Sequence, residues 1–193
     1  WKEFCEASAK RTSKDELVLL MGSLPNNFPD DALAQLTRAI HSAGGKLLID
    51  TAPAAFPTLK SEVVDFISPN LEEAEALIHK TSGDLFVPNS ENLESRAMEA
   101  AAHLFGTVAK NVMVTTGSHG CAFKNADEQW YLPAYVIPPE RYKSAVGAGD
   151  SFVAGFVSYV AKHPSDANWK RAVRYGMATA ASSVETFRAG GID

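Results

Sequence analysis

A glycine-rich turn that ends in an aspartate is the stretch of this sequence best suited to chemistry. Gly147, Ala148, Gly149 and Asp150 precede apolar residues at helical spacing over 152–160, so the turn is expected to open a helix. Two glycines one residue apart let backbone N–H groups approach an anion, and a helix N-terminus adds partial positive charge. The pattern therefore predicts a site for a phosphate or a developing phosphoryl charge, with Asp150 as the catalytic residue at its mouth.

Two other interpretations of this turn follow from spacing alone. Asp150 is equally suited to cap the helix N-terminus in a plain turn, because aspartate fills that role readily. A dinucleotide-binding fingerprint is disfavoured, since Phe152 stands where the third glycine of G-x-G-x-x-G is required. Spacing alone does not decide whether Asp150 is a helix cap or a catalytic residue.

The composition limits the classes of protein. The 193 residues are 46% apolar and 21% charged, enough for one domain with a full core. A net charge of −5 without a Lys/Arg cluster argues against a nucleic-acid surface. No apolar run approaches a membrane span, and Cys5 and Cys121 are too few for a disulfide framework or a thiolate metal site. We expect a soluble cytoplasmic protein with neither nucleic acid nor membrane as partner.

The apolar pattern predicts alternating strands and helices. Strands are expected at residues 17–21, 47–49, 63–67 and 112–115, and the first is expected to be buried on both faces. Helices are expected from 31 to 44, over 71–80 and 91–105, and from about 168 to 187. This alternation predicts an α/β fold, a mainly parallel doubly wound sheet with helices on both faces. Residues 121–124 and 129–132 add a small antiparallel hairpin in the C-terminal half, and 135–143 is expected as loop or edge strand.

Polar residues gather where the predicted strands end. Asp50-Thr51, Asn70 and Thr116 each follow an apolar run. Ligands of such sheets bind outside the carboxyl ends of the strands, so one site is expected there.

The stretch around Asp150 resembles the C-terminal signature of the ribokinase/PfkB-type carbohydrate kinases, with residues 145–155 carrying the likeness. The resemblance implies a ribokinase-like sheet with ATP and Mg²⁺ as cofactors. It implies that the amides of Gly147, Ala148 and Gly149 form an anion hole for the transferring phosphoryl group. It also implies that Asp150 accepts the proton of the sugar hydroxyl.

Asn70 and Glu73 have the spacing of a capping box, which is one explanation of both residues. The same stretch resembles the Asn-x-x-Glu motif of the family, which implies that Asn70 and Glu73 organise Mg²⁺ and its waters near the phosphates. Some phosphosugar kinases of the family carry Lys just before Pro-Asn. Ser68 stands there in this chain.

The stretch from Thr115 to Gly120 resembles the nucleotide-side loop of the family. The resemblance implies contacts from Thr116, Gly117 and Gly120 to the phosphates or ribose of ATP, whereas a strand-to-strand turn would need the same glycines. It also implies that the late Ala-rich helix flanks adenine, although small residues equally allow close helix packing.

Residues 21–25 resemble the Gly-Ser-Leu-Pro turn of the hexose-phosphate branch, the 1-phosphofructokinases and tagatose-6-phosphate kinases. The resemblance runs from about residue 17 almost to the end, and the family's N-terminal sugar-binding segment and β-lid are not found. Residues 1–193 are therefore expected to form a single α/β domain, the nucleotide-binding and catalytic portion of a kinase acting on a sugar or sugar-phosphate hydroxyl. The resemblance also implies that lid contacts can hold the complete protein as a homodimer. The alternatives are a catalytically inactive nucleotide-binding fragment and a partner-binding α/β domain whose glycines only form turns.

Overall fold

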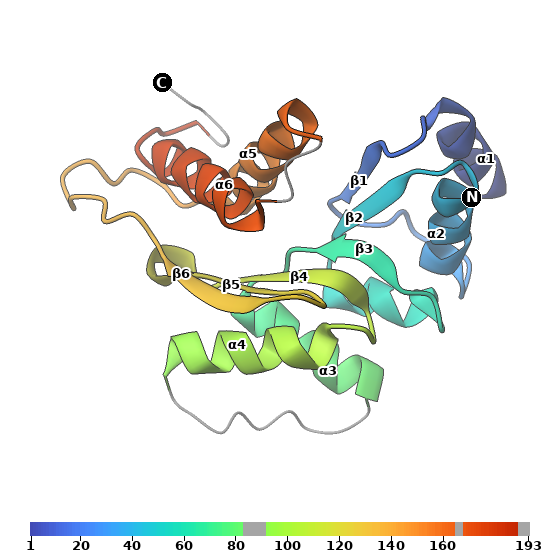
Figure 1. Cartoon of the computed structure of the whole chain (residues 1–193), viewed down its shortest axis with the longest axis horizontal. Helices are drawn as coiled ribbons and strands as arrows, with labels where there is room; N and C mark the ends of the chain where they lie inside the picture. Colours follow the sequence, from blue (N-terminus) through green and yellow to red (C-terminus); the bar gives the residue numbers. More distant parts are fainter. Residues whose placement is uncertain (83–91, 165–167, 189–193) are drawn as a thin grey trace. The chain divides into compact units, whose positions relative to one another are not determined.

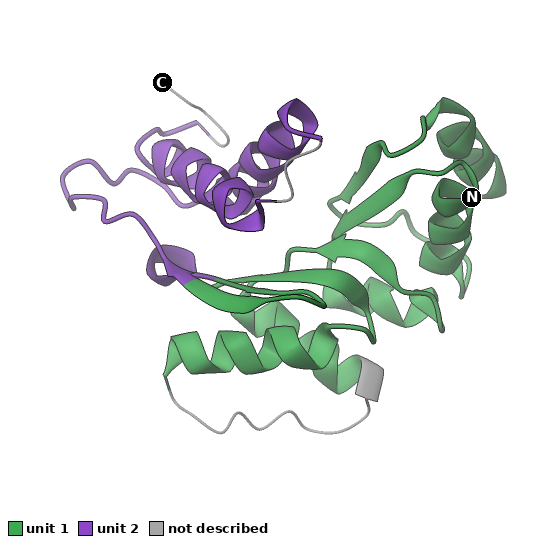
Figure 2. Ribbon diagram, viewed as in Figure 1, with its two compact units in different colours: residues 1–116, 122–131 green, residues 117–121, 132–193 purple. Residues whose placement is uncertain are grey.

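The computed structural model describes residues 1–82, 92–164 and 168–188. The chain divides into two compact units (Figure 2). Unit 1 comprises residues 1–116 and 122–131, and unit 2 comprises residues 117–121 and 132–193. The expectation of a single domain over residues 1–193 stays a prediction.

The strands form one sheet in which spatial order equals chain order (Figure 1). They are β1 (Leu17–Met21), β2 (Lys46–Asp50), β3 (Val64–Ile67), β4 (Ala109–Thr115), β5 (Gly120–Lys124) and β6 (Gln129–Pro133). β1 to β4 pair in parallel. β5 and β6 form the antiparallel hairpin, in whose turn Asn125 N–H donates to the Glu128 carbonyl at 3.0 Å. A mainly parallel α/β sheet with a hairpin is thus confirmed.

One helix of unit 1 precedes β1, and the other helical elements of this unit connect the parallel strands. In chain order, the helical elements are α1 (Lys2–Arg11), α2 (Ala32–Ser42), the 3₁₀ helix η1 (Pro53–Leu59), α3 (Leu71–Ser82) and α4 (Leu93–Leu104). α2 buries Leu33, Leu36 and Ile40, the apolar positions one turn apart that predicted it. Glu91, the first residue of the helix expected over 91–105, lies outside the described residues.

The prediction that residues 17–21 are buried on both faces is wrong. The strand forms as expected, but Leu19 and Met21 are 39% and 38% exposed, and the other three residues are half-buried. β1 is the end strand of the sheet, and Val18 and Leu20 pack against the core, whereas Leu19 and Met21 alternate to the opposite face. In contrast, all four residues of β3 are buried between two neighbouring strands.

Unit 2 contains a pair of packed helices, α5 (Ala148–Lys162) and α6 (Trp169–Val184), and the short 3₁₀ helix η2 (Gly117–His119). Residues 135–143 form neither helix nor strand, in agreement with the loop alternative. The amides of Lys143 and Ser144 donate to the Val184 carbonyl at 2.8 and 3.2 Å. These bonds fix the segment that enters α5 against the C-terminal end of α6.

A buried carboxylate joins four elements of unit 1 at the amino ends of the strands. Asp65 on β3 accepts from the backbone N–H of Leu47 at 2.9 Å, from Lys110 Nζ at 2.9 Å and pairs with His41 Nε2 at 2.7 Å. Burial alone would raise the pKa of Asp65, but these hydrogen bonds outweigh it and hold the pKa below its usual value.

The lowered pKa predicts an acid-sensitive contribution to stability. A depressed carboxyl pKa stabilises the folded state above the unfolded-state value of about 3.9, and this contribution is lost as pH falls through the folded-state pKa. We expect Asp65→Asn to lower the free energy of unfolding by about 2 kcal/mol at pH 7. The difference from wild type should shrink towards pH 3. Urea denaturation at both pH values checks this, with Asp127→Asn, an exposed aspartate, as the matched control. A constant difference at both pH values would contradict it.

Candidate functional site

The turn before α5 needs a glycine at position 147. Gly147 is the N-cap of α5 and has φ +81°, in the left-handed region that residues with a Cβ avoid. The helix begins at Ala148, and Asp150 lies in its first turn. The alternative in which Asp150 itself caps the helix is therefore wrong, because the cap position belongs to Gly147.

Backbone donors are available at this helix N-terminus. The N–H groups of Gly147, Gly149 and Asp150 donate to no acceptor among the residues that the structure describes. The Ala148 N–H donates to the Ala145 carbonyl at 3.1 Å, and the Ser151 N–H donates back to the Gly147 carbonyl at 2.9 Å. Of the three amides implied by the family resemblance, the one of Ala148 is thus engaged in the turn. Gly149 and Asp150 supply the open helix donors.

The carboxylate of Asp150 lies at the surface, beside these donors in sequence. Asp150 and Gly149 are exposed, and a Cβ added at Gly149 would meet no atom within 4 Å. Ser151, the next residue, is only 4% exposed, and its Oγ has no hydrogen-bond partner within the described part of the chain. The first turn of α5 therefore combines an exposed acidic residue with backbone amides that donate to no acceptor in the described part of the chain.

Asn70 and Glu73 form the capping box that their spacing predicted. The Glu73 N–H donates to Asn70 Oδ1 at 2.9 Å, and the Asn70 N–H donates to Glu73 Oε2 at 2.9 Å. This reciprocal pair accounts for the start of α3 by itself. It leaves the Glu73 Oε1 and the Asn70 Nδ2 without a partner in the described residues, and Asn70 is exposed.

The predicted gathering at the strand ends holds for Asn70 and Thr116. Asn70 forms a parallel bridge with Thr115, and the Thr115 N–H donates to the Pro69 carbonyl at 3.0 Å. Thr116 follows directly, and its Oγ1 lies 2.7 Å from the hydroxyl oxygen of Tyr131. Ser68 is 7% exposed, and its Oγ has no partner among the described residues.

The predicted residues fall into two groups. Asn70, Glu73 and Thr116 belong to unit 1 and meet at the carboxyl ends of β3 and β4. The other group belongs to unit 2 and consists of Gly117, Gly120, Gly147, Ala148, Gly149 and Asp150.

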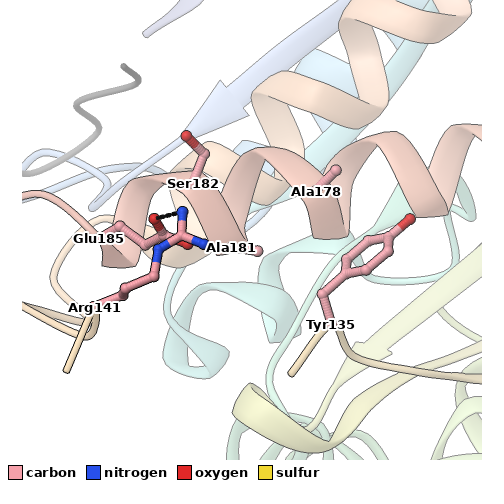
Figure 3. A pocket seen from close by; sticks show the side chains of 6 residues that line it. All are labelled: Tyr135, Arg141, Ala178, Ala181, Ser182 and Glu185. Atoms are coloured by element: carbon pink, nitrogen blue, oxygen red, sulfur yellow. Dashed lines mark hydrogen bonds and ion pairs between the residues drawn. The ribbon is translucent and has the colours of Figure 1, made fainter. Parts of the chain in front are cut away.

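Unit 2 also contains a pocket beside α6, the Ala-rich helix that the resemblance places next to adenine. Figure 3 shows Tyr135 and Arg141, both from the loop after β6, approaching one face of α6 at opposite ends of the pocket. Arg141 forms an ion pair with Glu185. The cavity measures about 370 Å³, within the range of small-ligand sites. The rest of its lining is Ala178, Ala181 and Ser182.

One signal in the sequence could have found part of this pocket. Ala178, Ala181, Ser182 and Glu185 follow the i, i+3, i+4, i+7 spacing that places residues on one helix face. Tyr135 and Arg141 carry no such signal, because their positions depend on a loop without regular structure.

The described residues contain neither a metal-binding cluster nor a membrane-spanning helix. No group of three or more His, Cys, Asp or Glu side chains there is arranged to hold a metal ion. Among the same residues, every helix is too short or too polar to traverse a bilayer.

Comparisons with known proteins agree with this architecture. A family model described as "pfkB family carbohydrate kinase" matches residues 1–192. The 1-phosphofructokinase of Xanthomonas campestris pv. campestris is 34% identical over 147 residues, covering 73% of this chain and 42% of that protein. The 1-phosphofructokinase of Haemophilus influenzae is 28% identical over 157 residues, covering 81% of this chain and 47% of that protein. The chain thus spans less than half the length of these curated relatives.

Solved structures support the fold. The phosphofructokinase-2 of Escherichia coli in complex with potassium superposes with a TM-score of 0.79 at 23% identity, over 99% of this chain and 58% of that one. The ribokinase of Thermotoga maritima gives a TM-score of 0.66 at 23% identity, over 98% and 56%. At this level of identity, the likeness establishes the ribokinase-like fold.

Proposed function

The chain belongs to the pfkB family of carbohydrate kinases, and we propose that it supplies the catalytic and nucleotide-binding part of an ATP-dependent sugar-phosphate kinase. The observation that carries the proposal is the first turn of α5, where the exposed Asp150 carboxylate stands beside open backbone donors. The 1-phosphofructokinase relatives favour a sugar phosphate as the acceptor.

In this proposal, Asp150 is the general base. Its carboxylate accepts the proton of the sugar hydroxyl as the hydroxyl oxygen bonds to the γ-phosphorus of ATP. The bond from that phosphorus to the bridging oxygen breaks, so the products are the phosphorylated sugar and ADP. A base in hydrogen-bond reach of the attacking hydroxyl contributes about 10²- to 10⁴-fold to such a reaction.

The backbone of the same turn would stabilise the transferring group. Negative charge on the phosphoryl oxygens is favoured by N–H donors and by the positive end of the α5 dipole. Gly147 and Gly149 present such donors, and Ala148 can contribute only where its bond to Ala145 is shared or released. Phosphoryl transfer depends mainly on positioning and electrostatics. A helix N-terminus and one carboxylate can therefore supply the catalytic groups that the protein contributes.

The remaining predicted residues would hold the nucleotide and its metal. We assign the phosphates or ribose to Thr116, Gly117, Gly120 and Asn70. Glu73 fits Mg²⁺ because its free Oε1 can face a metal-bound water, and Mg²⁺ is usually held through few carboxylates and several waters. When bound, Mg²⁺ would neutralise charge on the β- and γ-phosphate oxygens.

The pocket beside α6 suits the adenine ring. The small side chains of Ala178 and Ala181 leave room for a flat base, and the aromatic ring of Tyr135 lines the same cavity. Aromatic and apolar surface with a few polar groups is typical of such pockets. Ser182 and the Arg141–Glu185 pair would supply those polar groups.

A second candidate function is nucleotide binding without turnover by these 193 residues. It is favoured because the match to this chain covers only 42% and 47% of the two relatives. Turnover needs the sugar to be oriented and water to be excluded, and the remaining part of such relatives could supply both.

Calorimetric titration with Mg²⁺-ATP, combined with a kinase assay on fructose phosphates, tests both functions. We expect ATP binding by the 193-residue chain and turnover by the full-length protein. Turnover by the 193-residue chain itself would overturn the second candidate, and binding without turnover in the full-length protein would overturn the first. No binding in either would overturn both candidates.

A further inference from the structure

The hydroxyl of Tyr131 lies within hydrogen-bond distance of the Thr116 side-chain hydroxyl. The oxygen–oxygen distance is 2.7 Å, and either hydroxyl could be the donor. Thr116 follows the last residue of β4, whereas Tyr131 lies in β6, two strands away in the sheet. The bond therefore links the end of the central strand β4 to β6, the hairpin strand at the edge of the sheet.

Tyr131 is well placed to act as a fixed support. Its ring packs against the hydrophobic core of unit 1. Its neighbour Trp130 is 9% exposed and stacks on Phe123 of β5 with ring centroids 4.7 Å apart. Adjacent residues of a strand point to opposite faces of the sheet, so β6 is anchored on both faces around Tyr131.

The chemistry of the two hydroxyls gives this bond a direction when a phosphate is present. A fully ionised phosphate oxygen only accepts hydrogen bonds, so Thr116 must donate its single proton to it. The Thr116 Oγ1 can then still accept, and the Tyr131 hydroxyl can donate to it. The chain from tyrosine to threonine to phosphate satisfies all three groups, and each bond strengthens the next.

We propose that Tyr131 is a positioning residue that holds the Thr116 hydroxyl ready to donate to the nucleotide. The inference rests on the proposed function, in which Thr116 contacts ATP. Without the tyrosine hydroxyl, the Thr116 side chain would lose one hydrogen bond that favours this rotamer, and a smaller fraction of molecules would present the donor correctly. The loss should therefore appear in ATP affinity.

A double-mutant cycle on ATP affinity tests the proposal in the full-length protein. We expect Tyr131→Phe to raise the Kd and KM for ATP by about 3- to 10-fold, as for loss of one hydrogen bond. The kcat and the KM for the sugar phosphate should change little. Thr116→Val should weaken ATP binding at least as much. In the Thr116→Val background, Tyr131→Phe should have no further effect, because it acts through a hydroxyl that is already gone.

Two further variants separate positioning from a general structural effect. Thr116→Ser keeps the hydroxyl and should keep both the ATP affinity and the response to Tyr131→Phe. Tyr175→Phe removes a hydroxyl from a 55% exposed tyrosine of α6 and should leave the Kd for ATP unchanged.

The outcomes distinguish the inference from the proposed function. Normal ATP binding by Tyr131→Phe, or equal losses from it in the wild-type and Thr116→Val backgrounds, would overturn the inference and leave the proposed function standing. A wild-type protein that binds no ATP would overturn both.

Discussion

Replacing Asp150 by Asn should lower kcat by about 10²- to 10⁴-fold while the Kd for ATP stays within about twofold of wild type. Asparagine keeps the shape of the side chain but cannot take up the proton of the attacking hydroxyl, so the loss falls on the chemical step. Asp150 is exposed and lies in the first turn of α5, where the change should cost stability only through the helix dipole, about 0.3–1 kcal/mol. Steady-state kinetics of the full-length protein and ATP titration measure the two effects separately.

The matched control for this prediction is Asp127→Asn. Asp127 is also exposed, in the turn of the β5–β6 hairpin, and its change should leave kcat and the Kd for ATP unaltered. If Asp150→Asn retained wild-type turnover, Asp150 would not be the base. If it lost ATP affinity and turnover by the same factor, the residue would belong to nucleotide binding and not to proton transfer.

The sequence was sufficient to predict the fold because the apolar runs of the strands and the helical spacing of apolar residues are both clear. The apolar runs of β1 to β4 and the one-turn spacing of Leu33, Leu36 and Ile40 are local signals, and strand–helix alternation leaves few topologies. Burial of β1 was mispredicted for a non-local reason. An apolar run such as residues 17–21 does not indicate whether the strand lies at the edge or in the middle of the sheet, and so does not predict how much of it is buried.

The candidate site was predicted where one motif carries both the backbone conformation and the chemistry. Gly147 is required by its positive φ, and Asp150 follows at a fixed distance along the helix. The bond from the Ala148 N–H to Ala145 could not be predicted, because it depends on how the turn tightens. Tyr131 and Arg141 could not be predicted either, since they reach their partners only through tertiary structure.

The capping box shows where one sequence pattern serves two interpretations. Asn70 and Glu73 make the two reciprocal bonds of a helix start, yet each keeps polar atoms that those bonds do not use. A helix cap at the carboxyl end of β3 also holds its side chains in fixed positions, where they can contact a ligand. The local structure is therefore settled by geometry, whereas the metal role rests on the proposed function.

The close packing of α5 on α6 gives the second large prediction, which concerns stability. A Cβ added at Gly176 would lie 2.7 Å from the Phe152 carbonyl oxygen and within 3.0 Å of its ring. A Cβ at Gly155 would lie 2.3 Å from Thr179 Oγ1 and 2.8 Å from the Tyr175 carbonyl oxygen. Backbone atoms cannot yield as flexible side chains do, so the helices would have to separate.

We expect Gly176→Ala and Gly155→Ala each to lower the free energy of unfolding by about 1–3 kcal/mol, although alanine in a helix interior otherwise gains about 1 kcal/mol over glycine. For a chain of this size, Tm should fall by about 2–4 °C per kcal/mol. Gly149→Ala is the control for stability, because no atom lies within 4 Å of its added Cβ. It should leave Tm unchanged or raise it. Adding Thr179→Ala should rescue Gly155→Ala only in part, since the clash with the Tyr175 carbonyl remains. Equal Tm values for the wild type, Gly155→Ala and Gly176→Ala would show that the two helices do not pack this closely.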